Sequence, residues 1–298
     1  SNRLKTRESQ PEMNLVPSNE SYNDGILRVG PSERKAYRYD QAGNMVEKGT
    51  DYNVNGESIN YNSRSGPGVS YWKYDYNARN RLSEVYKNGD SESDKIASYE
   101  YDYSGKRVKV TEGEQVTYYV YNYQGKVIFE DHIGKKREVS YIYAFGKVIA
   151  KKEKKEVKEG DKLTEVEEIY YYHHDNLGST MAITDEEGQL VYQQDYVPFG
   201  RDIYKPGTLK KPDYDVEARM KFTGQIKDVN TGLYYYNARY YDPEIGRFTM
   251  EDSYQGELNN PQTLNLYIYT LNNPLKYTDP TGNKTWMVHG TYSSPKTF

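Results

Sequence analysis

Aromatic and polar residues alternate through the first half of the chain, a pattern typical of β-strands. The run Tyr37-Arg-Tyr39-Asp40-Gln-Ala-Gly43 places two tyrosines at alternate positions before an aspartate, a small polar pair and a glycine. Alternate side chains share one face of a strand, and an aspartate followed closely by glycine favours a turn. The pattern therefore predicts a β-hairpin beginning near Tyr37.

The same pattern recurs, so the first half is predicted to be a series of stacked hairpins. The aspartate or its substitute stands at positions 40, 75, 102, 122 and 144. Turns are expected near Gly43, Gly105 and Gly125. If the alternation continues to the turn, one face of a strand carries each of two triplets, Tyr99, Tyr101 and Tyr103, and Tyr119, Tyr121 and Tyr123.

A stretch dense in lysine and glutamate, residues 151–168, allows two interpretations. It could be a disordered linker, but Glu159-Gly-Asp-Lys162 is a good turn between two segments that read as strands. We therefore favour a long, solvated hairpin.

Composition supports an all-β fold and excludes several classes of protein. The 298 residues include 35 tyrosines but only 6 phenylalanines, 2 tryptophans and no cysteine. Tyrosine favours strands and tolerates a wet neighbourhood. A net charge of −4 argues against nucleic-acid binding, and the lack of cysteine excludes disulfides and Cys zinc sites. No apolar run is long enough to span a membrane, and the N-terminus does not resemble a signal peptide.

From Tyr170 onward the chain is dense in motifs, of which residues 232–248, GLYYYNARYYDPEIGRF, are the most specific. The first half resembles the YD repeats of bacterial Rhs proteins, and residues 170–282 resemble the Rhs-repeat-associated core domain. The resemblance implies repeats that wind as a spiral β-sheet into a hollow shell, with the core domain as a plug at one end. A variable toxin would follow the core and stay inside the shell until delivery.

On this resemblance the chain has four expected parts: an N-terminal segment 1–36, a YD-repeat sheet 37–169, the core domain 170–282 and the start of the toxin at 283–298. The repeats are too few to close a shell, so the rest of the same polypeptide is an expected partner. An immunity protein and a secretion or delivery machinery are the others, with membranes reached only through the toxin. No cofactor is expected, and the protein would be secreted or delivered to target cells.

The resemblance also implies self-cleavage after the core by two aspartates that share one proton, as in aspartic proteases. Asp279-Pro-Thr-Gly282 fits one motif, but Asn283 replaces the leucine after which cleavage would occur. The other motif, at Asp252, has lost its proline and leucine. The alternative is that Asp279-Pro-Thr-Gly is only a turn that ends the core.

Two further motifs have a structural alternative that we favour. His173-His174-Asp175 looks like a metal cluster, but neighbouring strand residues point to opposite faces, so a structural role with a turn at Asp175 is expected and no metal site is assigned. The arginine at 239 could bind an anion, but we expect it to stack among tyrosines and pair with a carboxylate. The residues expected to pack the plug are Tyr234, Tyr235, Tyr236, Arg239, Tyr240, Tyr241 and Asp242.

Three functions are predicted, in order of preference: a shell that encloses and delivers an effector in competition between bacteria, an autoprotease that frees it, and a surface adhesin for carbohydrate. The last residues bear on the effector. After Trp286-Met-Val, His289-Gly290 resembles the opening of α/β-hydrolase lipases, where the His-Gly backbone forms part of the oxyanion hole. The alternative is a plain linker strand.

Overall fold

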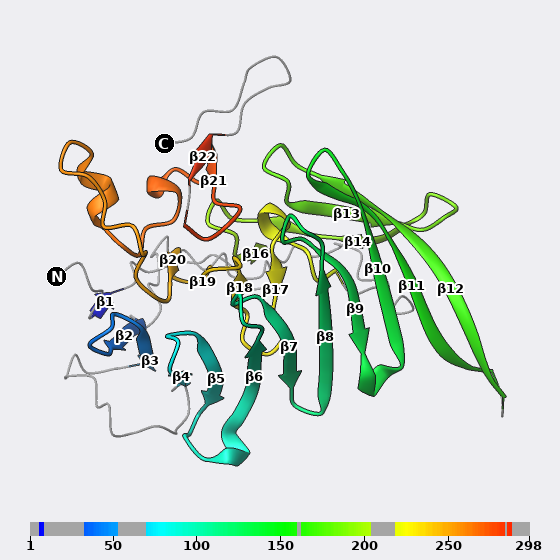
Figure 1. Cartoon of the computed structure of the whole chain (residues 1–298), viewed down its shortest axis with the longest axis horizontal. Coiled ribbons are helices and arrows are strands. Elements are labelled where there is room, and N and C mark those ends of the chain that lie inside the picture. Colours follow the sequence, from blue (N-terminus) through cyan, green and yellow to red (C-terminus); the bar gives the residue numbers. More distant parts are fainter. Residues whose placement is uncertain are drawn as a thin grey trace, which may run out of the picture. The chain divides into compact units, whose positions relative to one another are not determined.

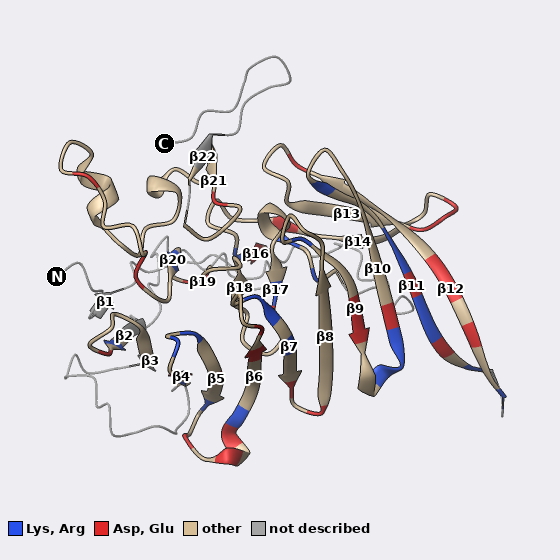
Figure 2. Cartoon of the chain, in the orientation of Figure 1, with Lys and Arg blue, Asp and Glu red and all other residues tan. Residues whose placement is uncertain are grey.

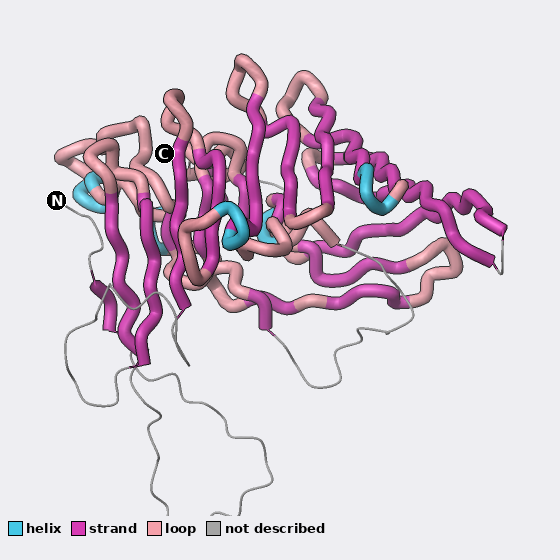
Figure 3. The backbone as a smooth tube through the Cα atoms, turned by 90° about the horizontal axis from the view of Figure 1, so that it is seen from below, coloured by secondary structure: helices cyan, strands magenta, loops and turns pink. Residues whose placement is uncertain are grey.

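The computed structural model describes residues 6–8, 33–52, 70–159, 162–203, 218–283 and 285–287. Strands dominate these ranges, and their helical segments are single short 3₁₀ turns (Figure 3). The all-β prediction is confirmed for this part of the chain, which also contains no helix long and apolar enough to cross a membrane. The chain divides into two compact units, residues 1–96 and 97–298, and this division falls inside the repeats.

The first unit is an antiparallel meander in which each strand pairs with the next along the chain. Its strands are β1 (Thr6–Glu8), β2 (Glu33–Tyr39), β3 (Met45–Tyr52), β4 (Ser70–Tyr76) and β5 (Leu82–Lys87), followed by the 3₁₀ turn η1 (Glu92–Asp94).

The second unit contains a meander of nine strands, the first of which begins two residues before the boundary between the units (Figure 1). These are β6 (Lys95–Tyr101), β7 (Arg107–Glu112), β8 (Gln115–Tyr121), β9 (Val127–His132), β10 (Arg137–Ala144), β11 (Lys147–Glu159), β12 (Lys162–His174), β13 (Thr180–Thr184) and β14 (Leu190–Gln193), with η2 (Ile133–Lys135) between β9 and β10. We call β6–β14 the wall.

The remainder of the second unit is built from short strands and turns, and we call residues 218–283 the core region. Two short strands precede it, β15 (Asp195–Tyr196) and β16 (Asp202–Ile203). Its own elements are η3 (Phe222–Gly224), β17 (Ile226–Lys227), β18 (Tyr234–Tyr235), β19 (Tyr240–Asp242), β20 (Arg247–Phe248), η4 (Pro261–Leu264), η5 (Thr270–Asn272) and β21 (Tyr277–Thr278); β22 (Trp286–Met287) comes after it.

One turn geometry recurs in the hairpins and explains the Asp-x-x-Gly pattern. In the β6–β7 turn, Asp102 Oδ1 accepts the N–H of Lys106 at 2.9 Å, and Gly105 takes a φ of 88° that favours glycine. A one-residue bulge comes next, because Tyr101 pairs with Arg107 whereas Glu100 pairs with Lys109. The turns predicted near Gly43, Gly105 and Gly125 are confirmed.

Two details of the predicted repeat are wrong. The second copy turns at Asn77 instead of Asp75: Asn77 Oδ1 accepts the N–H of Arg81, and Asn80 replaces glycine at a φ of 59°. Asp75 lies within β4, because the alternation of aromatics runs one step further to Tyr76. The other error concerns Tyr103 and Tyr123, which lie in turns instead of strands.

The predicted tyrosine triplets do not share a face, because each strand ends before its third tyrosine. Tyr99 and Tyr119 are buried, with 4% of their surface exposed. Tyr103 and Tyr123 instead come directly after the first residue of a turn and are each 93% exposed. Turn chemistry at Asp102 and Asn122 therefore overrides the period of two.

The tyrosine directly before a turn ties its hairpin to the preceding one. The hydroxyl of Tyr121 donates to the carbonyl of Arg107 at 2.6 Å, and that of Tyr143 donates to Val127 at 2.8 Å. Tyr76 makes the same bond to the carbonyl of Met45 in the first unit. In each case the acceptor is the first strand residue after the previous turn, so the repeat encodes a contact between neighbouring hairpins.

The charged stretch is a hairpin, as predicted. Strands β11 and β12 pair from Ala150 opposite Tyr171 to Glu159 opposite Lys162. Lysines of β11 face glutamates of β12 (Figure 2), and Lys152 and Lys154 lie 2.7 Å and 2.9 Å from Glu167 and Glu165. These exposed pairs each contribute at most about 1 kcal/mol, so this part of the hairpin is solvated. The prediction of a solvated stretch is wrong at its start, where Lys151 and Glu153 are buried and lie 2.8 Å apart.

Aromatic side chains form the centre of the core region. The fully buried cluster comprises Phe222, Tyr234, Tyr236, Tyr241, Phe248 and Tyr269. Ring centroids of Tyr241 and Tyr269 lie 4.5 Å apart, and the hydroxyl of Tyr241 donates to the carbonyl of Phe199 at 2.7 Å. Tyrosine can fill this core because such bonds satisfy its buried hydroxyl group.

Candidate functional site at the core junction

Asp252 and Asp279 meet at one side chain, the guanidinium of Arg239. Its Nη2 lies 2.6 Å from Asp252 Oδ2 and 3.8 Å from Asp279 Oδ2. The Arg239 and Asp279 side chains are only 4% and 3% exposed, and Asp252 is 16% exposed. Two motifs separated in sequence therefore place their carboxylates within 4 Å of the same nitrogen.

Packing fixes the position of Arg239. It immediately precedes β19, and its guanidinium carbon lies 3.7 Å from the ring centroid of Phe248. Burial lowers the pKa of Arg239, and the charges of Asp252 and Asp279 oppose that shift. The expected stacking against tyrosines is replaced by this phenylalanine, whereas the expected carboxylate partner is present.

The Asp279 turn brings the predicted cleavage position to the arginine. Asp279 Oδ1 accepts the backbone N–H groups of Thr281 at 3.1 Å and Gly282 at 2.7 Å. The carbonyl oxygen of Gly282 in turn accepts a hydrogen bond from Arg239 Nε. Gly282 has a φ of 80°, and a Cβ there would lie 2.6 Å from the carbonyl oxygen of Tyr236, so only glycine fits.

A cavity of about 90 Å³ adjoins these groups. Asp252, Asp279, Arg239 and Asn283 line it, together with side chains from the segment between Tyr254 and Leu271. This volume exceeds what one water molecule needs. The arrangement thus combines two carboxylates, a cation bonded to a peptide carbonyl, and room for water beside that peptide.

The chain after the junction turns back onto the core region. In β22, Trp286 pairs with Thr278 and Met287 pairs with Tyr277 of β21. The sequence predicted a strand here as the first strand of the toxin, and the structure pairs it with the core. His289 and Gly290, the predicted oxyanion-hole residues, lie outside the described residues.

The residues expected to pack the plug are buried. The exposed fraction is at most 3% for all seven: Tyr234, Tyr235, Tyr236, Arg239, Tyr240, Tyr241 and Asp242. Glu112 of the wall also reaches this region, since its carboxylate lies 3.0 Å from Arg219 Nη1 and accepts the N–H of Asn230 at 2.8 Å.

Sequence reasoning missed a second buried arginine, Arg107 at the start of β7. Its side chain is fully buried, its Nη1 lies 2.7 Å from Asp228 Oδ2, and its guanidinium carbon lies 4.4 Å from the ring centroid of Tyr235. It joins the wall to the core region. The repeat could have revealed it, because Arg107 is the first strand residue after its turn, and the same position in other repeats is apolar, as at Met45 and Val127.

The histidine pair is divided between environments, as predicted. His173 is exposed, with Nε2 3.1 Å from Thr184 Oγ1, whereas the His174 ring stacks on Tyr172. Burial lowers the pKa of His174 to about 4. Asp175 Oδ1 accepts the N–H of Ser179 at 2.7 Å, which forms the expected turn. No group of three metal-ligating side chains occurs within the described ranges.

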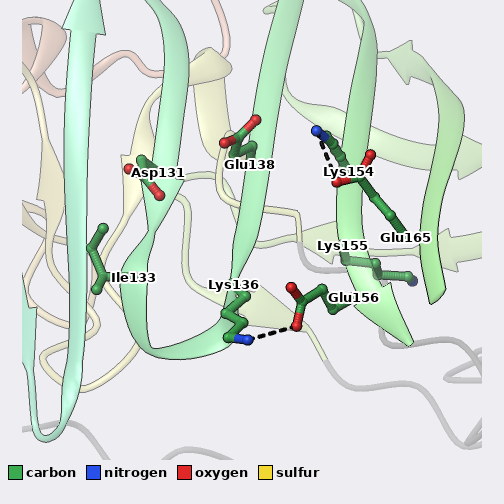
Figure 4. A pocket seen from close by; sticks show the side chains of 8 residues that line it. All are labelled: Asp131, Ile133, Lys136, Glu138, Lys154, Lys155, Glu156 and Glu165. Atoms are coloured by element: carbon green, nitrogen blue, oxygen red, sulfur yellow. Dashed lines mark hydrogen bonds and ion pairs between the residues drawn. The ribbon is translucent and has the colours of Figure 1, made fainter. Parts of the chain in front are cut away.

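A larger hollow, about 270 Å³, lies on the charged hairpin and its neighbours (Figure 4). Each of its three lysines is paired with a glutamate: Lys136 lies 2.8 Å from Glu156 and Lys154 lies 2.9 Å from Glu165, both within the hollow, and Lys155 lies 2.9 Å from Glu168 outside it. These charges neutralise one another, so we assign no function to the hollow.

The fold and the repeat define a segment of a YD-shell protein. The Teneurin YD-shell family model matches residues 162–275. The tRNA3(Ser)-specific nuclease WapA of Bacillus spizizenii is 32% identical over 79% of this chain and 9% of its own length. Toxin protein Tse5 of Pseudomonas aeruginosa is 38% identical over 38% of this chain and 8% of its own.

A solved structure has the same fold. The crystal structure of TcdB2-TccC3-Cdc42 superposes on 85% of this chain and 13% of the solved chain, with a TM-score of 0.55 and 19% identity. The chain belongs to the bacterial Rhs/YD-repeat family, as its motifs predicted. It spans about a tenth of the length of the curated relatives it matches.

Proposed function

We propose that this chain is the wall and plug of an Rhs shell that encloses a C-terminal effector and delivers it in competition between bacteria. In this proposal residues 1–36 lead into the shell, 37–169 form the YD-repeat sheet, 170–282 the core domain and 283–298 the start of the effector. The observation that supports it is the interlocked series of hairpins, together with the aromatic core region that Arg107 joins to the wall through Asp228.

The test is protection of the effector in the full-length protein. A tag placed at its C-terminus should resist trypsin while the shell is folded and become cleavable after mild denaturation. A tag that trypsin removes equally fast from the folded protein contradicts enclosure. The expected partners are the rest of the polypeptide, an immunity protein and a delivery machinery, and the protein would be secreted or delivered to target cells.

A second function, autoproteolysis at the junction, is favoured by the convergence of Asp252, Asp279 and Arg239. One aspartate takes a proton from water as the water oxygen attacks the carbonyl carbon of Gly282. Arg239, already bonded to that carbonyl oxygen, stabilises the negative charge that develops there. The other aspartate, protonated, donates its proton to the leaving nitrogen of Asn283.

Intact-mass spectrometry of the freshly purified chain tests this chemistry. We expect a break at the Gly282–Asn283 bond, abolished by Asp279→Asn and by Asp252→Asn. Glu251→Gln is the matched control, because this neighbouring carboxylate bonds Tyr267 and lies outside the cavity lining. A chain that stays intact on prolonged incubation, or a break that survives Asp279→Asn, contradicts the proposal.

The nature of the effector stays a prediction from sequence. The His289-Gly290 pair favours a lipase-like enzyme aimed at membranes, and its test is the coding sequence beyond Phe298. A Gly-x-Ser-x-Gly turn within about the next 100 residues supports this. A nuclease or deaminase signature there instead excludes it.

A further inference from the structure

Three consecutive hairpins of the wall carry an aromatic ring at the tip of the turn. Tyr103 and Tyr123 are each 93% exposed, and Phe145 is 103% exposed relative to an extended reference. Single exposed aromatics on a protein surface are ordinary. Three in succession at the tips of β6–β7, β8–β9 and β10–β11 require an explanation.

The turns themselves do not need an aromatic residue. In the other hairpins of the meander with the same turn, the position directly after the first turn residue is Gln41, Ala78, Asn176 or Glu186. These turns keep the same backbone hydrogen bonds as those at Tyr103 and Tyr123. The rings of Tyr103 and Tyr123 are therefore an addition to a turn that folds without them.

Phe145 is unfavourable in two respects. Its φ is 50°, a left-handed conformation that asparagine or glycine adopts with less strain. Its whole side chain is also in contact with water. A residue that is strained and solvated without an intramolecular benefit points to a partner outside the chain.

The three tips lie on one rim of the wall. The wall is an antiparallel meander, so alternate turns lie at the same end of the strands (Figure 1). Successive tips are two strands apart, a spacing of about 9.5 Å. The second and third tips are also joined, since Lys126 Nζ donates to the carbonyl of Gly146 at 2.7 Å, and the third is joined to the next turn, where Lys147 Nζ donates to the carbonyl of Asp175 at 3.3 Å.

The charge of this rim is positive. A lysine stands directly after the glycine of each tip, at Lys106, Lys126 and Lys147. The carboxylate that begins the turn is kept at Asp102 but replaced by Asn122 and Ala144 in the next two tips. The three tips thus carry three ammonium groups and one carboxylate, and the next turn along the rim adds Asp175.

We propose that this aromatic rim, Tyr103, Tyr123 and Phe145, docks the wall on an anionic lipid surface. Rings on separate convex tips insert individually into the interfacial layer of a bilayer, where tyrosine places its ring in the apolar region and its hydroxyl in water. The adjacent lysines attract anionic headgroups, and the exposed Lys147 does so most directly, because the ammonium groups of Lys106 and Lys126 also pack on the rings of Tyr121 and Tyr143.

Co-flotation of the 298-residue chain with vesicles tests the proposal. We expect binding to vesicles in which phosphatidylglycerol makes up roughly a quarter of a phosphatidylcholine bilayer, and weaker binding to phosphatidylcholine alone. Replacing Tyr103, Tyr123 and Phe145 together by serine should abolish binding, and each single replacement should weaken it about tenfold. Phe145→Asn distinguishes loss of the ring from loss of the fold, because asparagine removes the aromatic side chain and adopts this left-handed backbone conformation with less strain. This variant should stay folded and still bind vesicles more weakly.

The matched control is a triple variant that removes exposed apolar side chains elsewhere, Tyr118→Ser, Ile142→Thr and Leu258→Ser, and it should bind vesicles as the wild type does. The proposal is overturned if the wild type does not float with anionic vesicles, or if the rim variant floats equally well. Self-association that depends on the rim, without vesicle binding, would assign it to a protein contact and overturn it as well. Autoproteolysis plays no part in this assay.

Discussion

The wall and the core region use the same residue types in opposite ways. In the wall, contacts are short-range in sequence and repeat, as when the hydroxyl groups of Tyr121 and Tyr143 reach carbonyls 14 and 16 residues earlier. In the core region, tyrosine rings pack into one cluster, and buried charges meet partners more than 100 residues away, as Arg107 meets Asp228.

This difference predicts that unfolding is more cooperative in the core region than in the wall. A wall of similar hairpins gains stability in small, nearly independent increments. A cluster with buried ion pairs loses stability abruptly when one member is removed, because the remaining charge is left without compensation. Substitutions in each region can test this contrast.

The largest effect is expected at Arg107. Arg107→Met should lower the free energy of unfolding by about 3–5 kcal/mol, because Asp228 becomes a buried carboxylate without its cation. Urea denaturation measures the change. Lys152→Met is the control, since its pair with Glu167 is exposed and should contribute less than about 1 kcal/mol. Equal losses in the two variants would remove the distinction between the buried pair that joins the wall to the core region and an exposed pair within the wall.

An intermediate and additive effect is expected in the wall. Tyr121→Phe and Tyr143→Phe should each cost about 1 kcal/mol, because each removes one hydrogen bond to the preceding hairpin. The double variant should lose the sum, as independent sites do. Tyr123→Phe, which changes an exposed hydroxyl, should leave stability unchanged. Strong coupling in the double variant would show that the wall is as cooperative as the core region.

The smallest effect concerns pH. Burial lowers the pKa of His174 to about 4, against about 6.5 in an unfolded chain. Between these values the unfolded state binds more protons, so His174 makes stability fall as pH drops from about 6.5 to about 4. His174→Gln should flatten this part of a plot of thermal stability against pH. His173→Gln, at the exposed neighbour, should not, and a slope unchanged in His174→Gln contradicts the assignment.

Sequence predicted the wall better than the core region for a physical reason. Hairpin turns depend on a few adjacent residues, so the Asp-x-x-Gly pattern is enough to predict where most of them lie. The errors at Asp75 and Tyr103 arose where alternation and turn chemistry compete: the turn overrides the alternation at Tyr103, whereas at Asp75 the alternation continues to Tyr76 and the turn begins only at Asn77. The charged hairpin was also predictable, because a good turn separates two segments of matching pattern.

The candidate site was predictable in its residues but not in its geometry. Motif resemblance singled out Asp252 and Asp279, but the convergence of both on Arg239 depends on the long-range packing of Arg239 against Phe248. Arg107 shows the same limit. The sequence shows a charged residue at a repeat position that is otherwise apolar. Its partner, Asp228, is far away in the sequence and is identified only by the structure.

Because β22 pairs with β21, hydrolysis of the Gly282–Asn283 bond and dissociation of the segment after it are two separate steps. Thr278 and Trp286 pair on opposite sides of the Gly282–Asn283 bond. Hydrolysis there would leave the new N-terminus held to the core region by the pairing of β22 with β21. Release then becomes a second event with its own rate, which includes the opening of this two-residue ladder.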